Sequence, residues 1–317
     1  MSFMSDIEYK TIRRGGFAAQ AMAEWPTWAA ILLCYTGWLL LGGLLYPAHP
    51  VLALAGMAVT VAFHSSLQHE AIHGHPTPSA LCNELLVGLP LGLAYPYRRY
   101  RTTHLLHHRD ETLTDPHGDP ESYYWDRESW SQLGRARRQL LTANNTVLGR
   151  LLLGPLVGSL RFFLHDLRHI GAGDRTIRLA WAIHALSVLA VAAMVTRGFH
   201  MPFWLYALGP AYAGNALIGL RSYCEHQWHE TPDGRTIIVE RSLLSLLFLY
   251  NNLHVVHHAR PGEPWFRMPG LYAQDRAGWQ ARNRGYVYRG YRTIIRRHFL
   301  RPKEPLLHPV SPAGPRP

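Results

Sequence analysis

Histidine is concentrated in three short stretches of this chain, and neutral imidazole is the commonest metal-binding side chain in proteins. The stretches read HEAIHGH at residues 69–75, HLLHH at 104–108 and HVVHH at 254–258. With 20 histidines in 317 residues, the pattern H-x-x-H-H is expected about 0.08 times by chance, yet the chain contains it twice. We therefore interpret the three stretches as parts of a metal site rather than as water-facing positions of surface helices.

The spacing within each stretch directs several imidazoles the same way, because residues three and four apart share one face of a helix. The clustered histidines are His69 and His73, then His104, His107 and His108, and finally His254, His257 and His258. Eight imidazoles exceed the four ligands of a tetrahedral zinc site. The pattern therefore favours two metals of higher coordination number, without naming the metal or the reaction.

Residues outside the three histidine stretches limit which kinds of site are possible. Three scattered cysteines, Cys34, Cys82 and Cys224, do not supply the thiolates that hold an iron–sulfur cluster. The net charge of +11 does not indicate nucleic-acid binding, because the arginines flank apolar segments as membrane proteins place them. The roles of His64, His75 and His229 are not assigned by the sequence.

Long apolar segments must position the histidine clusters. Stretches of about 18–20 apolar residues can cross a bilayer as helices. The candidate spans are residues 26–46, 51–68, 179–196 and 201–220. Only a few residues separate the spans of each pair, so each pair forms an antiparallel hairpin. We expect an all-α integral membrane protein with two transmembrane hairpins, interfacial helices and a cytosolic histidine-rich cap.

Basic residues beside the first apolar segment predict the side of the membrane on which the N-terminus and the histidine clusters lie. Lys10, Arg13 and Arg14 precede the first span and place the N-terminus in the cytoplasm. All histidine clusters then face the cytoplasm if residues 80–96 and 147–164, which carry prolines or charges, are re-entrant or interfacial helices. The expected organisation is a cytosolic segment at 1–25, one membrane domain at 26–300 and a disordered proline-rich tail at 301–317.

The three histidine boxes resemble those of the membrane fatty acid desaturase and hydroxylase superfamily, and the similarity covers about residues 26–260. HEAIHG at residues 69–74, RSYCEH at 221–226 and NNLHVVHH at 251–258 resemble the bacterial branch in particular. The resemblance implies a further lone ligand about 28 residues before the third box, which is His226, with His229 as the weaker candidate. The implied ligand set is His69, His73, His104, His107, His108, His226, His254, His257 and His258.

The resemblance also implies a reaction. Family members hold a non-haem di-iron centre that uses O2 and two external electrons to abstract hydrogen from an unactivated C–H bond. Residues beside the ligands could orient the imidazoles, and these are Glu70, Glu225, Arg221 and Asn252. Asp119 and Glu121 follow the second box and could be orienting or structural. The haem motif of a fused cytochrome b5 is absent from the sequence, so we expect a separate ferredoxin, rubredoxin or cytochrome as the electron donor.

We therefore expect a fatty acyl desaturase in a bacterial inner membrane. Hydroxylation or ketolation of a lipid, carotenoid or small amphiphile is an alternative, because these outcomes diverge only after the first hydrogen abstraction. Desaturation of a small amino-acid-derived substrate is another. The non-enzyme alternative is a membrane metal-binding or transport protein, although transporters place their ligands near the bilayer midplane rather than at the ends of spans.

Overall fold

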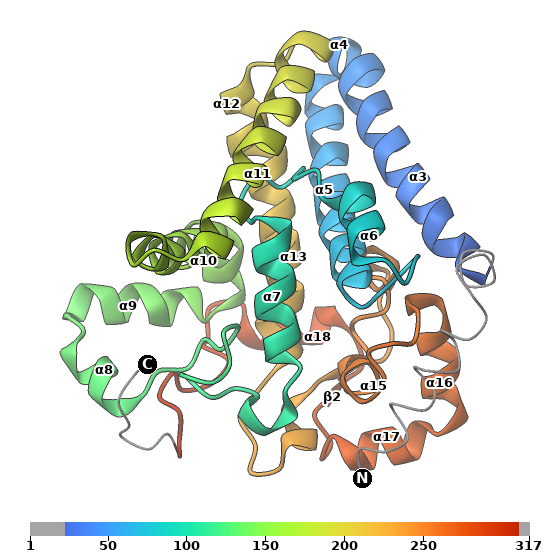
Figure 1. The fold of residues 1–317 in the computed structure, drawn as a ribbon. Coiled ribbons are helices and arrows are strands. Elements are labelled where there is room, and N and C mark those ends of the chain that lie inside the picture. The colour runs from blue at the N-terminus through green and yellow to red at the C-terminus, as the bar shows by residue number, and fades with distance from the viewer. Residues whose placement is uncertain (1–22, 311–317) are drawn as a thin grey trace.

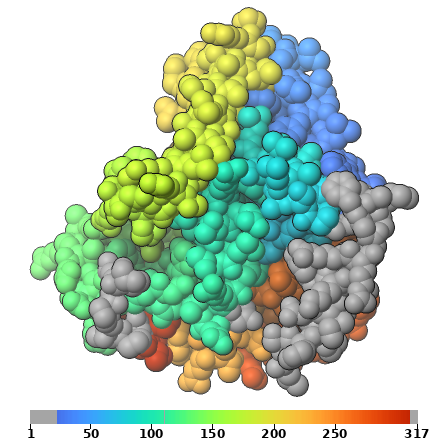
Figure 2. Space-filling model, in the orientation of Figure 1, coloured from blue at the N-terminus to red at the C-terminus, as the bar shows by residue number. Residues whose placement is uncertain are grey.

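A computed structural model describes residues 23–310, so the basic residues of the N-terminal segment lie outside the described part. Long helices form the narrow upper part of the molecule, and short helices and loops form a broader base (Figures 1 and 2). The long helices consist of the following elements, of which the shortest are segments that continue a neighbouring helix: α3 (Trp25–Leu40), η1 (Leu41–Leu45), α4 (Tyr46–Ala48), α5 (Pro50–Ile72), α10 (Val147–Gly171), α11 (Arg175–Ala193), η3 (Met194–Gly198), α12 (Phe203–Tyr206), η4 (Ala207–Ala211) and α13 (Tyr212–Glu225).

Short elements complete the fold. They are α6 (Ala80–Val87), α7 (Tyr97–His107), η2 (Asp110–Thr112), α8 (Arg127–Gln132), α9 (Arg135–Asn144), η5 (Pro232–Arg235), α14 (Leu244–Leu247), α15 (His254–Ala259), η6 (Trp265–Arg267), α16 (Met268–Gln274), α17 (Arg276–Arg282) and α18 (Tyr291–His298). Among the described residues the sheet is limited to β1 (Ile238–Val239) and β2 (Val287–Tyr288), which pair in parallel. The predicted all-α membrane architecture is confirmed.

Four helices are long and apolar enough to cross a membrane: Trp25–Ala48, Pro50–Ile72, Val147–Gly171 and Arg175–Gly198. Their outer faces expose large apolar side chains, including Leu33, Leu44, Val51 and Leu186, each more than 65% exposed. In water such surface would be costly, but it suits contact with lipid. The protein is therefore a multi-pass membrane protein.

The candidate spans differ from the sequence prediction at two helices. Residues 201–220 are helical within α12, η4 and α13, but they are not among the four, since this segment includes polar Asn215 and a Gly-Pro pair. The helix α10, for which an interfacial helix was predicted, is among the four by length and composition alone. Its Arg150 and Arg161 pack over the rings of Tyr223 and Trp125. Figure 1 views α10 nearly along its axis, so it lies steeply inclined to α3, α5 and α11.

Between α6 and α7 the chain is not helical, yet it passes among the long helices with Leu91 fully buried. Irregular backbone is tolerated at such depth only when its polar groups are satisfied by protein. Side chains from five different helical elements donate to five carbonyls at the end of α6 and in the segment that follows it. The bonds are Tyr35 to Leu86 at 2.9 Å, Gln68 to Val87 at 2.9 Å, Tyr206 to Leu91 at 2.8 Å, Asn215 to Gly92 at 2.8 Å and His184 to Leu93 at 2.9 Å.

A buried ion pair fixes α7, the helix that carries HLLHH. Arg99 donates from Nε and Nη2 to the two oxygens of Asp166 in α10 at 2.8 and 2.9 Å. The Asp166 side chain is fully buried and also accepts from Trp181 Nε1 of α11 at 2.9 Å. A bidentate pair of this kind is directional as well as strong. It therefore sets the position of α7 against α10 and α11.

Residues 301–308 were predicted to belong to a disordered tail, and the structure corrects this. Asn145 donates to the Glu304 carbonyl at 2.7 Å, and Trp125 N donates to the Leu306 carbonyl at 2.8 Å. Leu306 is buried. Prolines restrict helix and strand formation but do not prevent an extended segment from packing. The remaining tail residues, 311–317, lie outside the described residues.

We expect Asn215→Leu to destabilise the protein by about 1 kcal/mol, because the part-buried Gly92 carbonyl would lose the Asn215 amide and keep only the Ala94 N–H as a donor. Thermal unfolding in detergent measures the effect. Ser222→Ala is the matched control, since Ser222 lies on the same helix but is exposed and bonds only locally. Equal melting temperatures for the two variants would show that the carbonyl does not need this donor.

Candidate metal centre

The nine histidines named by the sequence lie together at the base of the long helices. His69 and His73 come from the C-terminal end of α5, and His226 directly follows α13. The HLLHH histidines end α7, and the HVVHH histidines form α15. In Figure 1 the lower ends of α5, α7 and α13 approach α15. Segments far apart in the sequence thus meet at one point.

The nine side chains form two groups, and within each group one ring nitrogen from every histidine lies within 4.8 Å of those of the others. The first group is His69, His73, His104, His108 and His257, and the second is His107, His226, His254 and His258. The boxes HLLHH and HVVHH each contribute to both groups. The repeated pattern therefore builds two neighbouring clusters, each from both halves of the chain.

The ring nitrogens are too crowded to be satisfied by hydrogen bonds alone. His104 Nε2 lies 3.0 Å from both His73 Nε2 and His108 Nε2, and His226 Nε2 lies 2.9 Å from both His107 Nε2 and His254 Nε2. A ring nitrogen has either one proton or one lone pair, so it can make only one of two such bonds. A cation placed among the nitrogens would satisfy all the lone pairs at once.

These spacings also suit a metal ion. Two imidazole nitrogens bound at about 2.1 Å and at right angles to each other would be about 3.0 Å apart. His257 Nε2 and His108 Nε2 lie 3.1 Å apart in the same manner, and His69 Nε2 is buried without a hydrogen-bond partner among the described residues. The donor set consists of imidazoles, which suit iron, zinc, copper and nickel. The residues present therefore fit a two-metal centre.

The outer nitrogens of three histidines are held by acceptors. His104 Nδ1 lies 2.9 Å from Glu121, His107 Nδ1 lies 2.8 Å from Asp119, and His254 Nδ1 lies 3.1 Å from Asn251 Oδ1. Each acceptor places the imidazole proton on Nδ1 and leaves the Nε2 lone pair facing the group. Such partners fix the tautomer and ring orientation of metal-binding histidines.

Sequence reasoning identified only part of this supporting set. Asp119 and Glu121 were left undecided, and the structure places both against histidines. Asn251 was missed, although its position three residues before His254 was a usable signal. Asn252 was named instead, but its amide donates to the Val239 carbonyl at 2.6 Å and supports the backbone.

The other three predicted orienting residues lie close to the groups with different contacts. Glu225 accepts from Asn251 Nδ2 at 2.6 Å, so it acts on His254 through Asn251. Arg221 Nε lies 2.8 Å from Glu225, and both side chains are buried. Glu70 accepts from the backbone N–H of Trp265 at 2.8 Å and thereby holds the segment after α15.

Three histidines without assigned roles lie outside both groups. His64 Nε2 lies 3.1 Å from the Tyr35 hydroxyl, and His75 Nδ1 lies 2.7 Å from a carboxylate oxygen of Glu24. His229 Nδ1 accepts from the Thr231 N–H at 3.1 Å. These contacts indicate structural roles, and they separate His229 from His226.

Charge at the site comes from the acidic residues. Burial, joined by neighbouring imidazoles, holds the pKa values of His254 and His257 well below the usual range, so these side chains are neutral. Burial also acts to lower the pKa of His107, but Glu121 and Asp119 together with Glu225 raise it to about 9. Metal binding would displace a proton from such a group. The carboxylates thus supply negative charge that nine neutral ligands lack.

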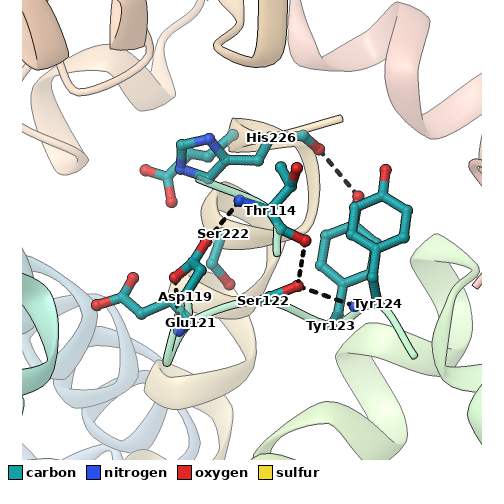
Figure 3. Close-up of a pocket in the computed structure, with 9 residues that line it drawn as sticks. Thr114, Asp119, Glu121, Ser122, Tyr123, Tyr124, Ser222 and His226 are labelled. Carbon is teal, nitrogen blue, oxygen red and sulfur yellow. Dashed lines mark hydrogen bonds between the residues drawn. The ribbon is translucent and has the colours of Figure 1, made fainter. Parts of the chain in front are cut away.

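A small cavity borders the second group (Figure 3). Its volume is about 30 Å³, which is enough for a water molecule. His226 Nδ1 is buried and has no hydrogen-bond partner among residues 23–310, so a water in this cavity is the kind of acceptor that it requires. The lining residues are Thr114, Asp119, Glu121, Ser122, Tyr123, Tyr124, Ser222, Glu225 and His226.

Comparison with protein-family models places the chain in a known family. The model described as fatty acid desaturase matches residues 44–290, which is most of the chain and includes all nine clustered histidines. A comparison with curated proteins found no match.

We expect Asp119→Asn to weaken metal binding by about 10–100-fold, because the variant removes the charge opposite His107 while keeping the side-chain shape. Metal content after equilibration at fixed free Fe²⁺ measures this. Asp115→Asn is the control, since Asp115 accepts from His117 and Gly118 backbone N–H groups in the same loop and contacts neither group. Equal affinity in both variants would contradict the role given to Asp119.

Proposed function

Since the chain belongs to the fatty acid desaturase family, we propose that it is a di-iron oxidase that uses O2 to desaturate a fatty acyl chain. Family membership makes it an oxidoreductase of the desaturase and hydroxylase type. The observation that carries the finer proposal is the pair of adjoining histidine groups with five and four potential ligands. A transport protein would not require two such groups at the ends of its long helices.

Iron is the metal we propose, with the nine clustered histidines as its ligands. When bound, the two irons supply the oxidising power of O2 for removing hydrogen from an unactivated C–H bond. The overall desaturation consumes O2, two electrons and two protons, converts one C–C single bond into a double bond and releases two waters. The protein's own contribution is to hold imidazoles in place and to shield the reacting carbon from water.

The supporting residues have defined tasks in this proposal. Asp119 and Glu121 retain the Nδ1 protons of His107 and His104, so these rings present Nε2 to the metals. Asn251 does the same for His254, and Glu225 fixes the amide of Asn251. Nearly complete burial of His104, His107, His254 and His257 limits entry of water. The site is thereby organised before substrate arrives.

The apolar surroundings support a lipid substrate. Large apolar side chains cover the outer faces of the long helices, and the histidine groups lie at the ends of those helices. A lipid chain could therefore reach the site from the bilayer without crossing water. The small cavity beside His226 holds little more than a water, and it does not accommodate a polar metabolite.

We also propose on which side of the membrane the histidine groups lie and which proteins supply the electrons. We place the histidine groups on the cytoplasmic side of a bacterial inner membrane, and electrons come from a separate ferredoxin, rubredoxin or cytochrome. Exposed arginines on the broad base suit an acidic donor. They are Arg135, Arg137, Arg276, Arg282, Arg284, Arg289, Arg292, Arg296 and Arg297.

We expect His257→Ala to abolish iron loading and product formation while leaving membrane insertion intact, because His257 belongs to the first group and lies outside the long helices. Mass spectrometry of lipids from expressing cells identifies the product. Loss of two hydrogens indicates desaturation, and gain of one oxygen indicates hydroxylation. His229→Ala is the control and should retain iron and product. Full product formation by the His257 variant would refute the assignment.

We also expect turnover to fall when ionic strength rises from about 0.01 to 0.2 M with the electron donor limiting, because salt screens charges on the arginine-rich base. A reductant without charge preference, supplied in place of the protein donor, serves as the control. A flat response with the protein donor would mean that docking does not depend on these arginines.

A further inference from the structure

His226 is held differently from the other eight clustered histidines. Those eight belong to boxes in which at least two histidines share one or two helical turns, so the helix itself fixes their relative positions. His226 stands alone, directly after α13, with extended backbone at φ −125° and ψ 150°. Its position in the second group therefore depends on contacts made by its own backbone.

Two side chains hold the His226 carbonyl. Lys303 Nζ donates to it, and the Tyr123 hydroxyl, whose single proton is shared between this carbonyl and Glu304, lies 3.0 Å away. The Lys303 side chain is only 5% exposed and lies 2.9 Å from a carboxylate oxygen of Glu304. Its ammonium group is also 5.1 Å from the centre of the Tyr123 ring. A cation at the C-terminal end of α13 is favoured by the helix dipole.

Glu304 extends this support to the next residues. Its two carboxylate oxygens accept from the hydroxyls of Tyr123 and Tyr124. Tyr124 Oη in turn accepts from the Trp228 N–H at 2.6 Å. The backbone is thus held at His226 and again two residues later. Figure 3 shows the paired rings of Tyr123 and Tyr124 on one side of the cavity and His226 above it.

The segment that carries Lys303 and Glu304 is itself anchored. Lys303 N donates to the Asn145 carbonyl at 3.0 Å, and Asn145 Nδ2 donates to the Glu304 carbonyl at 2.7 Å. Further along, Trp125 N donates to the Leu306 carbonyl and His308 N donates to the Trp125 carbonyl, at 2.8 and 3.0 Å. Residues 303–308, which we name the C-terminal strap, therefore cross the loop after box two and the start of α10.

A buried ion pair is a poor way to gain stability, because removing two charges from water costs about as much as their attraction returns. The placement of the Lys303–Glu304 pair on the backbone of His226 gives it a different use. We propose that the C-terminal strap positions His226 as a metal ligand, with Lys303 and Glu304 as positioning residues for the second histidine group. This inference rests on the proposed two-iron centre.

The test measures iron bound per full-length chain, in detergent, after equilibration at several fixed Fe²⁺ concentrations. The wild type should bind two irons. Lys303→Met should weaken one of the two by about 10–100-fold, since loss of supporting contacts typically costs that much in metal affinity. The other iron should bind as in the wild type, because the first group has no contact with the strap. Lys303→Arg should restore much of the lost affinity.

Two further variants distinguish a specific effect on one iron from a general loss of structure. Tyr123→Phe removes only the hydroxyl that lies between the His226 carbonyl and Glu304, and it should weaken the same iron to a smaller degree. Arg282→Met is the control, since it removes a cation paired with Asp233 at an exposed site. Two irons bound with wild-type affinity in both Lys303→Met and Tyr123→Phe would overturn the inference while leaving the proposed function intact. Equal loss of both irons with a lower melting temperature would also overturn it, because that indicates a general structural role. A wild type without two irons would refute the proposed function itself.

Discussion

The structure depends on bringing nine imidazoles from distant parts of the chain into contact, although their ring nitrogens cannot satisfy one another. His104 Nε2 and His226 Nε2 each face two other ring nitrogens about 3 Å away. Without a cation this crowding is unfavourable, because each nitrogen can satisfy only one neighbour. The rest of the fold must therefore hold the histidines in place until metal binds. Binding energy and folding energy are coupled in such a centre.

Several independent contacts oppose the crowding. The Arg99–Asp166 pair fixes α7, and the satisfied carbonyls of residues 86–93 fix the irregular segment that leads into it. Asp119, Glu121 and Asn251 orient single rings from behind. Each of these contacts holds a single element in place, from the irregular segment among the long helices to the imidazole rings at their base. The membrane part thus serves as a rigid frame for a polar site that it does not itself surround.

The sequence predicted the family, the helical membrane class and the nine histidines that the structure gathers, because their spacing is local and follows helical geometry. It could not identify contacts that depend on tertiary packing. Asn251 and Asn252 are adjacent in the sequence, and only the backbone path shows which one faces His254. The prolines near Lys303 suggested disorder, whereas a buried ion pair and backbone hydrogen bonds hold that segment. The helix α10 is long and apolar enough to span a membrane, but its steep inclination to α3, α5 and α11 also suits the interfacial placement predicted from the sequence.

The central claim is that the two histidine groups together bind two irons through imidazole nitrogen. Iron K-edge X-ray absorption on the purified protein, combined with its iron content, tests this most directly. We expect about two irons per chain, with a nearest shell dominated by nitrogen at about 2.1 Å and with outer-shell scattering from imidazole rings. A single iron per chain, or a shell dominated by sulfur or carboxylate oxygen without imidazole scattering, would contradict it.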